Sequence, residues 1–332
     1  MITIKDIARE AGVSVMMVSR VVNHRYNEVS KDNVEKIQAI IKKLGYVPNS
    51  SARSLSSNSS RIISIIIQGI GNPLSSPYNA NMLGHIIQQV QAYGYNAMVH
   101  FIDDYAEVTK HLQSWKAEGA IFLGTFDENI RQIQEENKIP LIFTDSYSSI
   151  RQIINIGIDD YKGGTLAAKH FLEKGHRDFA VIAPHLHISQ VIQQRYQGFL
   201  DTLSQNGIAL PASHVMEPYE MADTLDAFCS LPNSVSAVFV ATDECAVDLI
   251  NGLKLRGYRI PEDYSVIGFD NLPASRYVLP GLTTIAQDIG LKAQYAVDTM
   301  FRYLQDRSLA TQNIVLDVKL IERDSVAVAN DH

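Results

Sequence analysis

The sequence predicts a small all-α helix-turn-helix headpiece followed by a two-lobed α/β core with parallel, doubly wound sheets. Three observations predict this fold class. Helical periodicity fills residues 3–44, apolar strand-like runs alternate with amphipathic helices from residue 62 onward, and a polar, serine-rich stretch separates the two regions. The length of 332 residues, 46% of them hydrophobic, indicates two or three domains.

Two short helices joined by a tight turn are predicted within residues 3–23. Thr3 and Asp6 have the spacing of a capping box, Gly12 supplies a backbone position without a Cβ penalty, and Ser14 can cap the second helix. The apolar residues at helical spacing are Ile4, Ile7, Ala8, Ala11, Val18, Val21 and Val22. This pattern predicts two helices that pack through one apolar face each.

The second of these helices carries side chains suited to a DNA groove. A helix-turn-helix directs the N-terminal residues of its second helix to base edges, while hydroxyl and amide groups hold phosphates. We therefore assign Val15 and Met16 to apolar contacts with bases, such as a thymine methyl, and Arg20 to a bidentate hydrogen bond with guanine. The residues assigned to phosphates are Ser14, Ser19 and Asn23. The alternative is a small helical subdomain with ordinary exposed residues.

A third helix is predicted over residues 30–45, and a linker follows at 46–61. The linker is too polar to fold alone, yet Ala52, Arg53 and Leu55 are spaced for one short helix. Such a segment can fold on DNA and place an apolar wedge in the minor groove.

Charge divides the chain at the same place. Residues 1–61 contain ten Lys/Arg and five Asp/Glu, which gives a net charge of +5, and the remainder carries −12. A basic head on an acidic body is the distribution expected when only the head meets phosphates.

From residue 62 the pattern is one of alternating strands and helices. Strands are predicted at 62–68, 95–101, 120–124, 140–144, 179–183, 237–242 and 264–269. Helices are predicted at 79–94, up to about Glu118, and at 128–136, 161–175, 189–206 and 245–257. The second series begins near residue 161, so we expect two α/β lobes in tandem.

Carboxylates stand where three predicted strands end. Asp145, Asp243 and Asp270 each follow a buried strand, and ligands of open α/β sheets bind beyond these strand ends. Carboxylates accept hydrogen bonds from pairs of sugar hydroxyls. Each aspartate has a plainer alternative as a helix cap. The loop at 71–80 is expected to overlook the same cleft, with Tyr78 lining it or lying in an ordinary turn.

Nine motifs resemble the lactose-repressor/galactose-repressor (LacI/GalR) family over almost the whole chain. They are IKDIAREAGVS, VSRVVN and GYVPNSSARSL near the N-terminus, then GIDDYKGG, GHRDFAVI, RYQGF, ATDECA, VIGFDN and LTTIAQD. The resemblance implies a core like that of periplasmic binding proteins, in which the chain crosses between lobes near 159–161, 286–290 and 315–320. The implied domains are a headpiece at 1–46, a hinge at 47–61 and a core at 62–332, with a first lobe of about 62–159 and 288–316 and a second lobe of about 160–287 and 317–332.

The resemblance also implies roles for single residues. Leu55 matches the intercalating hinge leucine and Ala52 its minor-groove neighbour. Arg195 and Asp270 match the arginine and aspartate that bind the effector, and Tyr219 aligns roughly with an aromatic that stacks on it. Two positions depart from the pattern: Met17 stands where family members usually have a phosphate-binding Thr, and Thr242 where some relatives have Asn for a sugar contact.

The function implied is transcriptional regulation, with repression of carbohydrate-utilisation genes expected on the ground of the resemblance. The chain would bind a pseudo-palindromic operator in double-stranded DNA as a homodimer, and a sugar or sugar derivative between the lobes would control it. A dimer is expected because no leucine-heptad tail follows the core. The alternatives are a stand-alone sugar-binding protein, a sugar-converting enzyme with a regulatory head, and a global catabolite regulator that needs a phosphorylated partner protein.

Other functional classes find little support in the sequence. No nucleotide-binding, hydrolase or zinc motif occurs, so we expect neither an enzyme nor a cofactor. His185 and His187 lack a third metal ligand, and Cys229 and Cys245 do not have metal-type spacing. The sequence contains no apolar run of 18 residues and no signal-peptide pattern, so a cytoplasmic protein without membrane contact is expected.

Overall fold

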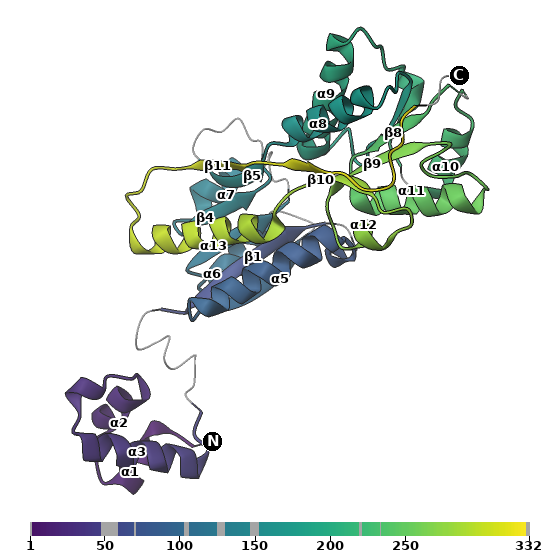
Figure 1. Ribbon diagram of the computed structural model, residues 1–332. Helices are drawn as coiled ribbons and strands as arrows, with labels where there is room; N and C mark the ends of the chain where they lie inside the picture. Colours follow the sequence, from purple (N-terminus) through teal and green to yellow (C-terminus); the bar gives the residue numbers. More distant parts are fainter. Residues whose placement is uncertain are drawn as a thin grey trace. The chain divides into compact units, whose positions relative to one another are not determined.

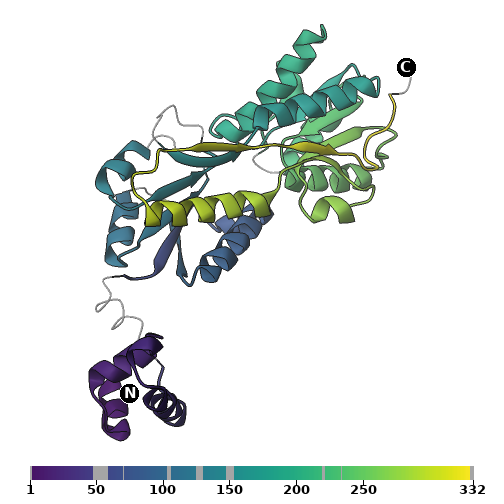
Figure 2. The ribbon, with the colours of Figure 1, turned by 60° about the vertical axis from the view of Figure 1, so that its left-hand side comes forward.

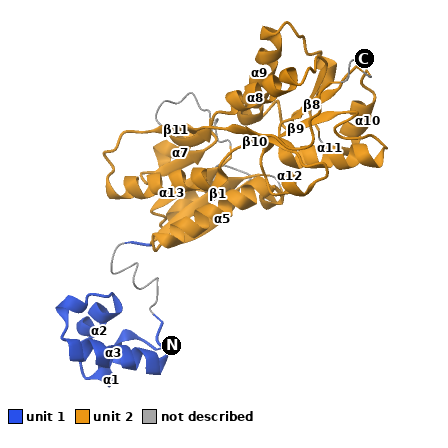
Figure 3. Cartoon of the chain, viewed as in Figure 1, with its two compact units in different colours: residues 1–60 blue, residues 61–332 orange. Residues whose placement is uncertain are grey.

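A computed structural model describes most of the chain, and it falls into two compact units (Figure 3). The described residues are 2–47, 59–69, 71–102, 106–124, 130–146, 153–218, 221–232 and 234–329. Unit 1 covers residues 1–60 and unit 2 covers residues 61–332. The expected hinge residues Ala52 and Leu55, and the expected aromatic Tyr219, lie outside the described residues.

Unit 1 contains the helical headpiece. Its elements are α1 (Ile4–Ala11), α2 (Val15–Val22), the 3-10 helix η1 (Tyr26–Glu28) and α3 (Lys31–Leu44). Ile7, Val18 and Ile37, one from each α-helix, are fully buried at its centre. The apolar faces expected of the three helices therefore meet in one small core.

The helix ends of the headpiece follow the local sequence. The Thr3 amide donates to Asp6 Oδ2 at 3.0 Å, and the Met17 amide donates to Ser14 Oγ at 3.2 Å. Gly12 and Gly45 end α1 and α3 in the left-handed conformation, which glycine adopts without strain. These contacts confirm the capping predicted at Thr3 and Ser14.

Unit 2 contains two six-stranded sheets (Figure 1). The first sheet has the order β11-β5-β4-β3-β1-β2, and its strands are β1 (Ile62–Gln68), β2 (Asn96–Ile102), β3 (Gly119–Leu123), β4 (Leu141–Thr144), β5 (Ile154–Ile158) and β11 (Asn313–Leu316). The second has the order β12-β10-β9-β8-β6-β7, and its strands are β6 (Phe179–Ile182), β7 (Val215–Met216), β8 (Ala237–Val240), β9 (Ser265–Asp270), β10 (Thr283–Ala286) and β12 (Lys319–Ile321). Every pair is parallel except β10 with β12. The predicted parallel sheets are therefore confirmed, with one antiparallel pair at this edge, where β12 follows directly from β11.

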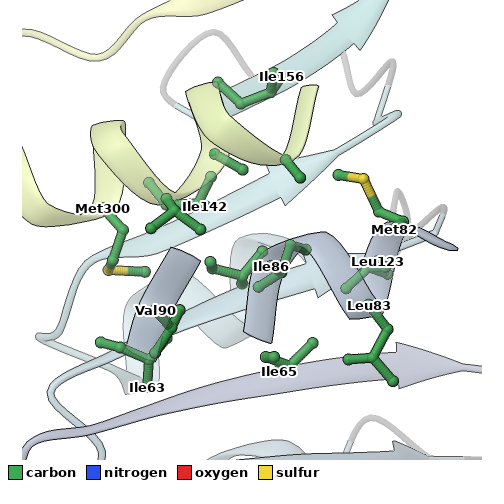
Figure 4. Close-up of a cluster of buried hydrophobic side chains, with 14 of the residues drawn as sticks. Ile63, Ile65, Met82, Leu83, Ile86, Val90, Leu123, Ile142, Ile156 and Met300 are labelled. Atoms are coloured by element: carbon green, nitrogen blue, oxygen red, sulfur yellow. The ribbon is translucent and has the colours of Figure 1, made fainter. Parts of the chain in front are cut away.

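Helices cover both faces of each sheet. In the first lobe these are α5 (Pro77–Ala92), α6 (Ala106–Ser114), α7 (Ile130–Glu136) and α13 (Ile289–Gln305). The first lobe also has the 3-10 turn η2 (Pro73–Ser75). In the second lobe the helices are α8 (Asp160–Glu173), α9 (Gln190–Gln205), α10 (Met221–Cys229) and α11 (Asp243–Leu255), with the short α12 (Ala274–Tyr277) and the 3-10 turn η3 (Ala212–His214). Figure 4 shows Ile63 of β1, Ile86 of α5 and Met300 of α13 in one apolar cluster. Segments from both ends of the core sequence therefore build the first lobe.

The chain crosses between the sheets three times, at 159, at 287–288 and at 317–318. Figures 1 and 2 show α13 lying over the first sheet and the β11–β12 segment running from one sheet to the other. In hinge closure of two lobes, a few loop residues such as those at these crossovers change their backbone angles.

One helix is shorter than its sequence pattern. The apolar periodicity predicts a helix up to about Glu118, but α6 ends at Ser114. Lys116 adopts a positive φ of 50°, and the Ala117 amide bonds back to the Leu112 oxygen. The left-handed residue therefore ends the helix before its pattern ends.

The helices α8 and α9 cross with their backbones in contact. A Cβ added to Gly164 would overlap the backbone oxygen of Arg195, and one added to Gly198 would overlap the backbone oxygen of Tyr161. Glycine is therefore required at both positions by the closeness of the helices. The crossing places the N-terminus of α8 beside the middle of α9.

This crossing gives a stability prediction. Gly198→Ala should lower the free energy of unfolding by about 3 kcal/mol, because the methyl group forces two packed backbones apart. The matched control is Gly84→Ala in α5, where an added Cβ meets nothing within 4 Å and where stability should rise by up to about 1 kcal/mol. Urea unfolding of both variants measures the difference, and equal effects would contradict the close crossing.

Candidate functional site

The N-terminal end of α2 forms an exposed surface on the headpiece. Val15 and Met16 are 39% and 64% exposed although both are apolar. Ser14 and Asn23, at the two ends of α2, are also exposed. These side chains are accessible in the way that contacts to a DNA groove require.

Met17, the position that departs from the family pattern, has a packing role. Its side chain is half-buried against the headpiece core. On the same helix, Asn23 Nδ2 donates to the Ser19 oxygen at 2.8 Å and to Ser19 Oγ at 3.3 Å. The Ser19 hydroxyl keeps its own hydrogen for donation to an acceptor.

Arg20 forms an ion pair that the sequence did not indicate. Its Nε lies 3.0 Å from Glu28 Oε2, and both side chains are partly exposed. An exposed pair of this kind contributes roughly 0–1 kcal/mol. This contact is made by Nε, whereas the two terminal nitrogens of a guanidinium have the geometry for guanine O6 and N7.

A cavity of about 180 Å³ lies between the two lobes of unit 2. Its polar lining includes Tyr78, Asp145, Arg195, Thr242, Glu244 and Asp270. Four of the expected effector residues therefore come together: Tyr78 and Asp145 from the first lobe, and Arg195 and Asp270 from the second. Glu244 was not expected here.

The first lobe contributes a buried cluster of three polar side chains. Tyr78 Oη donates to Asp145 Oδ2 at 2.6 Å, and Lys292 Nζ donates to Asp145 Oδ1 at 2.6 Å and to Tyr78 Oη at 2.8 Å. Lys292, on α13, is completely buried. Burial, followed by the adjacent Asp145 carboxylate, raises the pKa of Tyr78 well above its usual value, so its hydroxyl stays protonated.

Arg195 is the centre of the second-lobe side. Its Nε donates to Asp160 Oδ1 at 2.7 Å, and its Nη1 donates to the Ala241 oxygen at 2.8 Å and lies 3.3 Å from Asp270 Oδ1. The guanidinium carbon lies 3.6 Å from the centroid of the Phe269 ring. A side chain with only 4% exposure is held by all of these contacts, so its position is well defined.

Asp270 is buried, has an unusual backbone conformation and lies next to the charged Arg195 side chain. Gln287 Nε2 donates to its Oδ1 at 2.6 Å. Its φ of 115° is unusual for a residue with a side chain. Burial raises the pKa of Asp270, while the positive charge of Arg195 opposes that rise. Strained backbone and a perturbed carboxyl at a strand end are typical of a binding site.

Asp243 does not line the cavity, which corrects its expected role. Its side chain is fully buried, Leu272 N donates to its Oδ2 at 2.7 Å, and Thr284 Oγ1 donates to its Oδ1 at 2.6 Å. The carboxyl ties the turn after β9 to β10. The helix cap is Thr242, whose hydroxyl accepts from the Cys245 amide at 3.4 Å. Glu244, the next residue of α11, lines the cavity instead.

The carboxyl of Asp243 gives a prediction about pH. Burial first, and the nearby Asp270 carboxylate second, raise the pKa of Asp243 from 3.8 to about 8. Between these two pH values the folded chain retains a proton that the unfolded chain has released. The protonated carboxyl therefore stabilises the folded chain at low pH, and this contribution to the free energy of unfolding is lost as pH rises through about 8. Asp243→Asn abolishes this titration. The free energy of unfolding of Asp243→Asn minus that of the unsubstituted chain should therefore be on the order of 2 kcal/mol larger at about pH 9 than at about pH 5.

Urea unfolding at a series of pH values checks this difference. If the curves of stability against pH for Asp243→Asn and the unsubstituted chain stay parallel, the carboxyl is ionised in the folded protein throughout.

A larger hollow of about 560 Å³ lies beside the crossovers and shares Asp270 and Leu272 with the cleft cavity. Its other lining residues include His85, Arg276 and Lys319. We assign the binding site to the smaller cavity, because buried charged side chains from both lobes converge there.

Neither a metal centre nor a membrane span is found in the part of the chain that the structure describes. No group of three His, Cys, Asp or Glu side chains in this part is arranged to hold a metal ion. His187 lies 3.4 Å from Glu217, and His185 occupies a turn with a φ of 59°. None of the described helices is both long enough and apolar enough to cross a bilayer.

Comparison with known proteins identifies both units. Residues 3–49 match the family model of bacterial regulatory proteins of the lacI family, and residues 168–326 match that of a periplasmic binding protein-like domain. The chain is 30% identical to a probable HTH-type transcriptional repressor ExuR of Bacillus subtilis, over 98% of each chain. It is 27% identical to an HTH-type transcriptional repressor PurR of Mannheimia succiniciproducens, over 98% of this chain and 99% of the relative.

A solved structure extends the likeness to the arrangement of the elements. The lac repressor dimer bound to operator and an anti-inducer has a TM-score of 0.87 to this chain, with 26% identity over 98% of this chain and 99% of the repressor chain. Its match covers the headpiece and both lobes. The chain therefore belongs to the LacI family, as a transcriptional regulator with an N-terminal helix-turn-helix DNA-binding domain.

Proposed function

We propose that this regulator represses carbohydrate-utilisation genes, binds a pseudo-palindromic operator as a homodimer, and responds to a sugar or sugar derivative in the cleft between its lobes. The observation that carries the proposal is the interlobe cavity, where Tyr78 and Asp145 face Arg195 and Asp270. Carboxylates and a guanidinium at such a position suit the hydroxyls of a sugar. The names of the relatives, which include repressors, support the repressor role.

The DNA contacts are divided between the headpiece and the segment after it. Val15 and Met16 contact bases, and Arg20 reads a guanine. The phosphate contacts fall to Ser14, Ser19 and Asn23. Ala52 and Leu55 enter the minor groove at the centre of the operator. The exposure of the α2 residues and the net charge of +5 on residues 1–61 support this division.

The proposed homodimer has a candidate surface on the second lobe. Leu255, Tyr277 and Leu279 are apolar side chains with 89%, 80% and 72% exposure. Lys254 Nζ donates to the Leu279 oxygen at 2.7 Å, which holds the end of α11 beside this segment. Exposed apolar residues that gather in this way mark a protein interface, and the matched lac repressor structure is a dimer.

The effector controls DNA binding by favouring one arrangement of the lobes. A ligand that contacts Asp145 on one lobe and Asp270 on the other changes the free energy of closure at the crossovers. In a dimer this closure alters the spacing of the first lobes and hence of the DNA-binding segments. Effector and operator then change each other's affinity by the same factor.

The first test is operator binding. DNA selected from a random pool by the purified protein should contain a near-palindrome, and one sugar or sugar derivative should shift its apparent Kd. Arg195→Ala should retain operator binding within about threefold but lose at least about tenfold of the response to the sugar, since the second-lobe contacts disappear. The control is Arg259→Ala, whose side chain pairs with Asp263 on the surface. A normal sugar response in Arg195→Ala would refute the assigned site.

Glu28 gives a second DNA-binding prediction. Glu28→Gln removes a negative charge from the DNA-facing unit, so binding to unrelated DNA should strengthen about threefold. It also removes the ion pair that holds Arg20, so the preference for the operator over unrelated DNA should fall. Glu35→Gln in α3 makes the same charge change away from Arg20. If the preference for the operator over unrelated DNA falls by the same factor in both variants, the ion pair does not orient Arg20.

A further inference from the structure

We infer that the cleft selects a monosaccharide without an anionic group, and that Glu244 enforces this selection against sugar phosphates and sugar acids. The inference rests on the proposed sugar response and names the chemical class of the effector. It follows from the balance of charges around the cavity, from the hydrogen-bonding groups left available, and from the size of the space.

The cavity lining is predominantly acidic. Three carboxylates, Asp145, Glu244 and Asp270, line it. Among the described residues of the lining, Arg195 is the one side chain with a fixed positive charge. A ligand that enters this space therefore meets more negative charge than positive.

The positive charges near the cavity already have partners. Arg195 Nε contacts Asp160 at 2.7 Å, and its Nη1 lies 3.3 Å from Asp270. Lys292 is completely buried behind Asp145, which it contacts at 2.6 Å. A phosphate or carboxylate on the ligand would have to compete with these built-in carboxylates for each cation.

Two carboxylates of the lining present acceptor oxygens to a ligand. The described residues that donate to Asp270 do so at Oδ1, and none of them donates to Oδ2. Glu244 is exposed and has no hydrogen-bond partner among the described residues. Acceptors without donors are matched by the O–H groups of a neutral sugar or the N–H groups of an amino sugar, whereas a phosphate supplies further acceptors.

Glu244 also removes a feature that usually attracts phosphate. The N-terminus of a long helix such as α11 binds anions through its free amides and its dipole. Here Glu244 occupies the first turn of α11 and lines the cavity, and Thr242 caps the helix. Burial, Asp248 and Asp270 raise the pKa of Glu244, which agrees with a cluster of like charges. Glu244 therefore already supplies negative charge at the N-terminus of α11.

The volume limits the ligand to about one sugar ring. A cavity of about 180 Å³ with walls from both lobes has the size for one sugar ring. The effector class is thus a single neutral or amino sugar whose hydroxyls bridge Asp145 and Glu244 to Asp270.

The experiment is calorimetric titration of the full chain with matched sets of hexoses and pentoses. Each set contains the neutral sugar, its amino derivative, the corresponding uronic or aldonic acid, and the terminal phosphate. We expect a neutral or amino sugar to bind at least about tenfold more tightly than the acid and the phosphate of the same ring. An anionic member that binds as tightly as its neutral counterpart, or more tightly, overturns the inference and leaves the proposed sugar response standing. Binding by no member of any set overturns the proposed sugar site itself.

Two variants assign the selection to Glu244. Glu244→Gln should lower the affinity for the neutral sugar only modestly, because the amide oxygen still accepts a hydrogen bond, and should bring the affinity for the phosphate at least about threefold closer to it. Glu244→Lys should bring the two affinities closer still. Asp248→Asn is the matched control, since it removes an acidic charge from the same helix outside the cavity lining. If Glu244→Gln changes the ratio no more than Asp248→Asn does, Glu244 is not the selecting residue. Binding of the neutral sugar shows in each case that the variant is folded.

Discussion

The packing of α8 against α9 determines where the charges of the second lobe lie. Because Gly164 and Gly198 have no side chains, the two helix backbones touch, and Asp160 on α8 reaches the guanidinium of Arg195 on α9. Arg195 then extends to Asp270 at the end of β9. A buried guanidinium requires such partners, since an unpaired charge in the interior is strongly destabilising. The geometry of the cleft therefore depends on two glycines that never contact it.

The first lobe holds its charges in place by different means. Lys292 comes from α13, a helix that follows most of the second lobe in the sequence, and it donates to both Asp145 and Tyr78. Each lobe thus neutralises its own buried cation before any ligand arrives. Carboxylate oxygens therefore face the space between the two lobes, which three crossovers join. In the proposed mechanism, ligand recognition and lobe closure therefore involve the same side chains.

Much of the fold and part of the site could be predicted from the sequence. Alternating patterns placed most strands and helices, and the strand-end rule led to Asp145 and Asp270. Lys292 could not be found in this way, because a lysine within an amphipathic helix looks like a solvent-facing residue until packing shows that it is buried. Asp243 and Glu244 both follow β8. The residue at which α11 begins sets the directions of their side chains, and it therefore decides that Glu244 lines the cavity. The antiparallel β12 is too short to give a pattern of its own.

The return of α13 to the first lobe has a consequence for the order in which the chain is made. The core of that lobe includes Ala293, Val297 and Met300, which leave the ribosome only after most of the second lobe. The headpiece, by contrast, has its whole core within residues 2–47 and can fold early. A nascent chain therefore possesses a complete DNA-binding surface for most of its synthesis, but it acquires a cleft that can sense a ligand only when its last segments emerge.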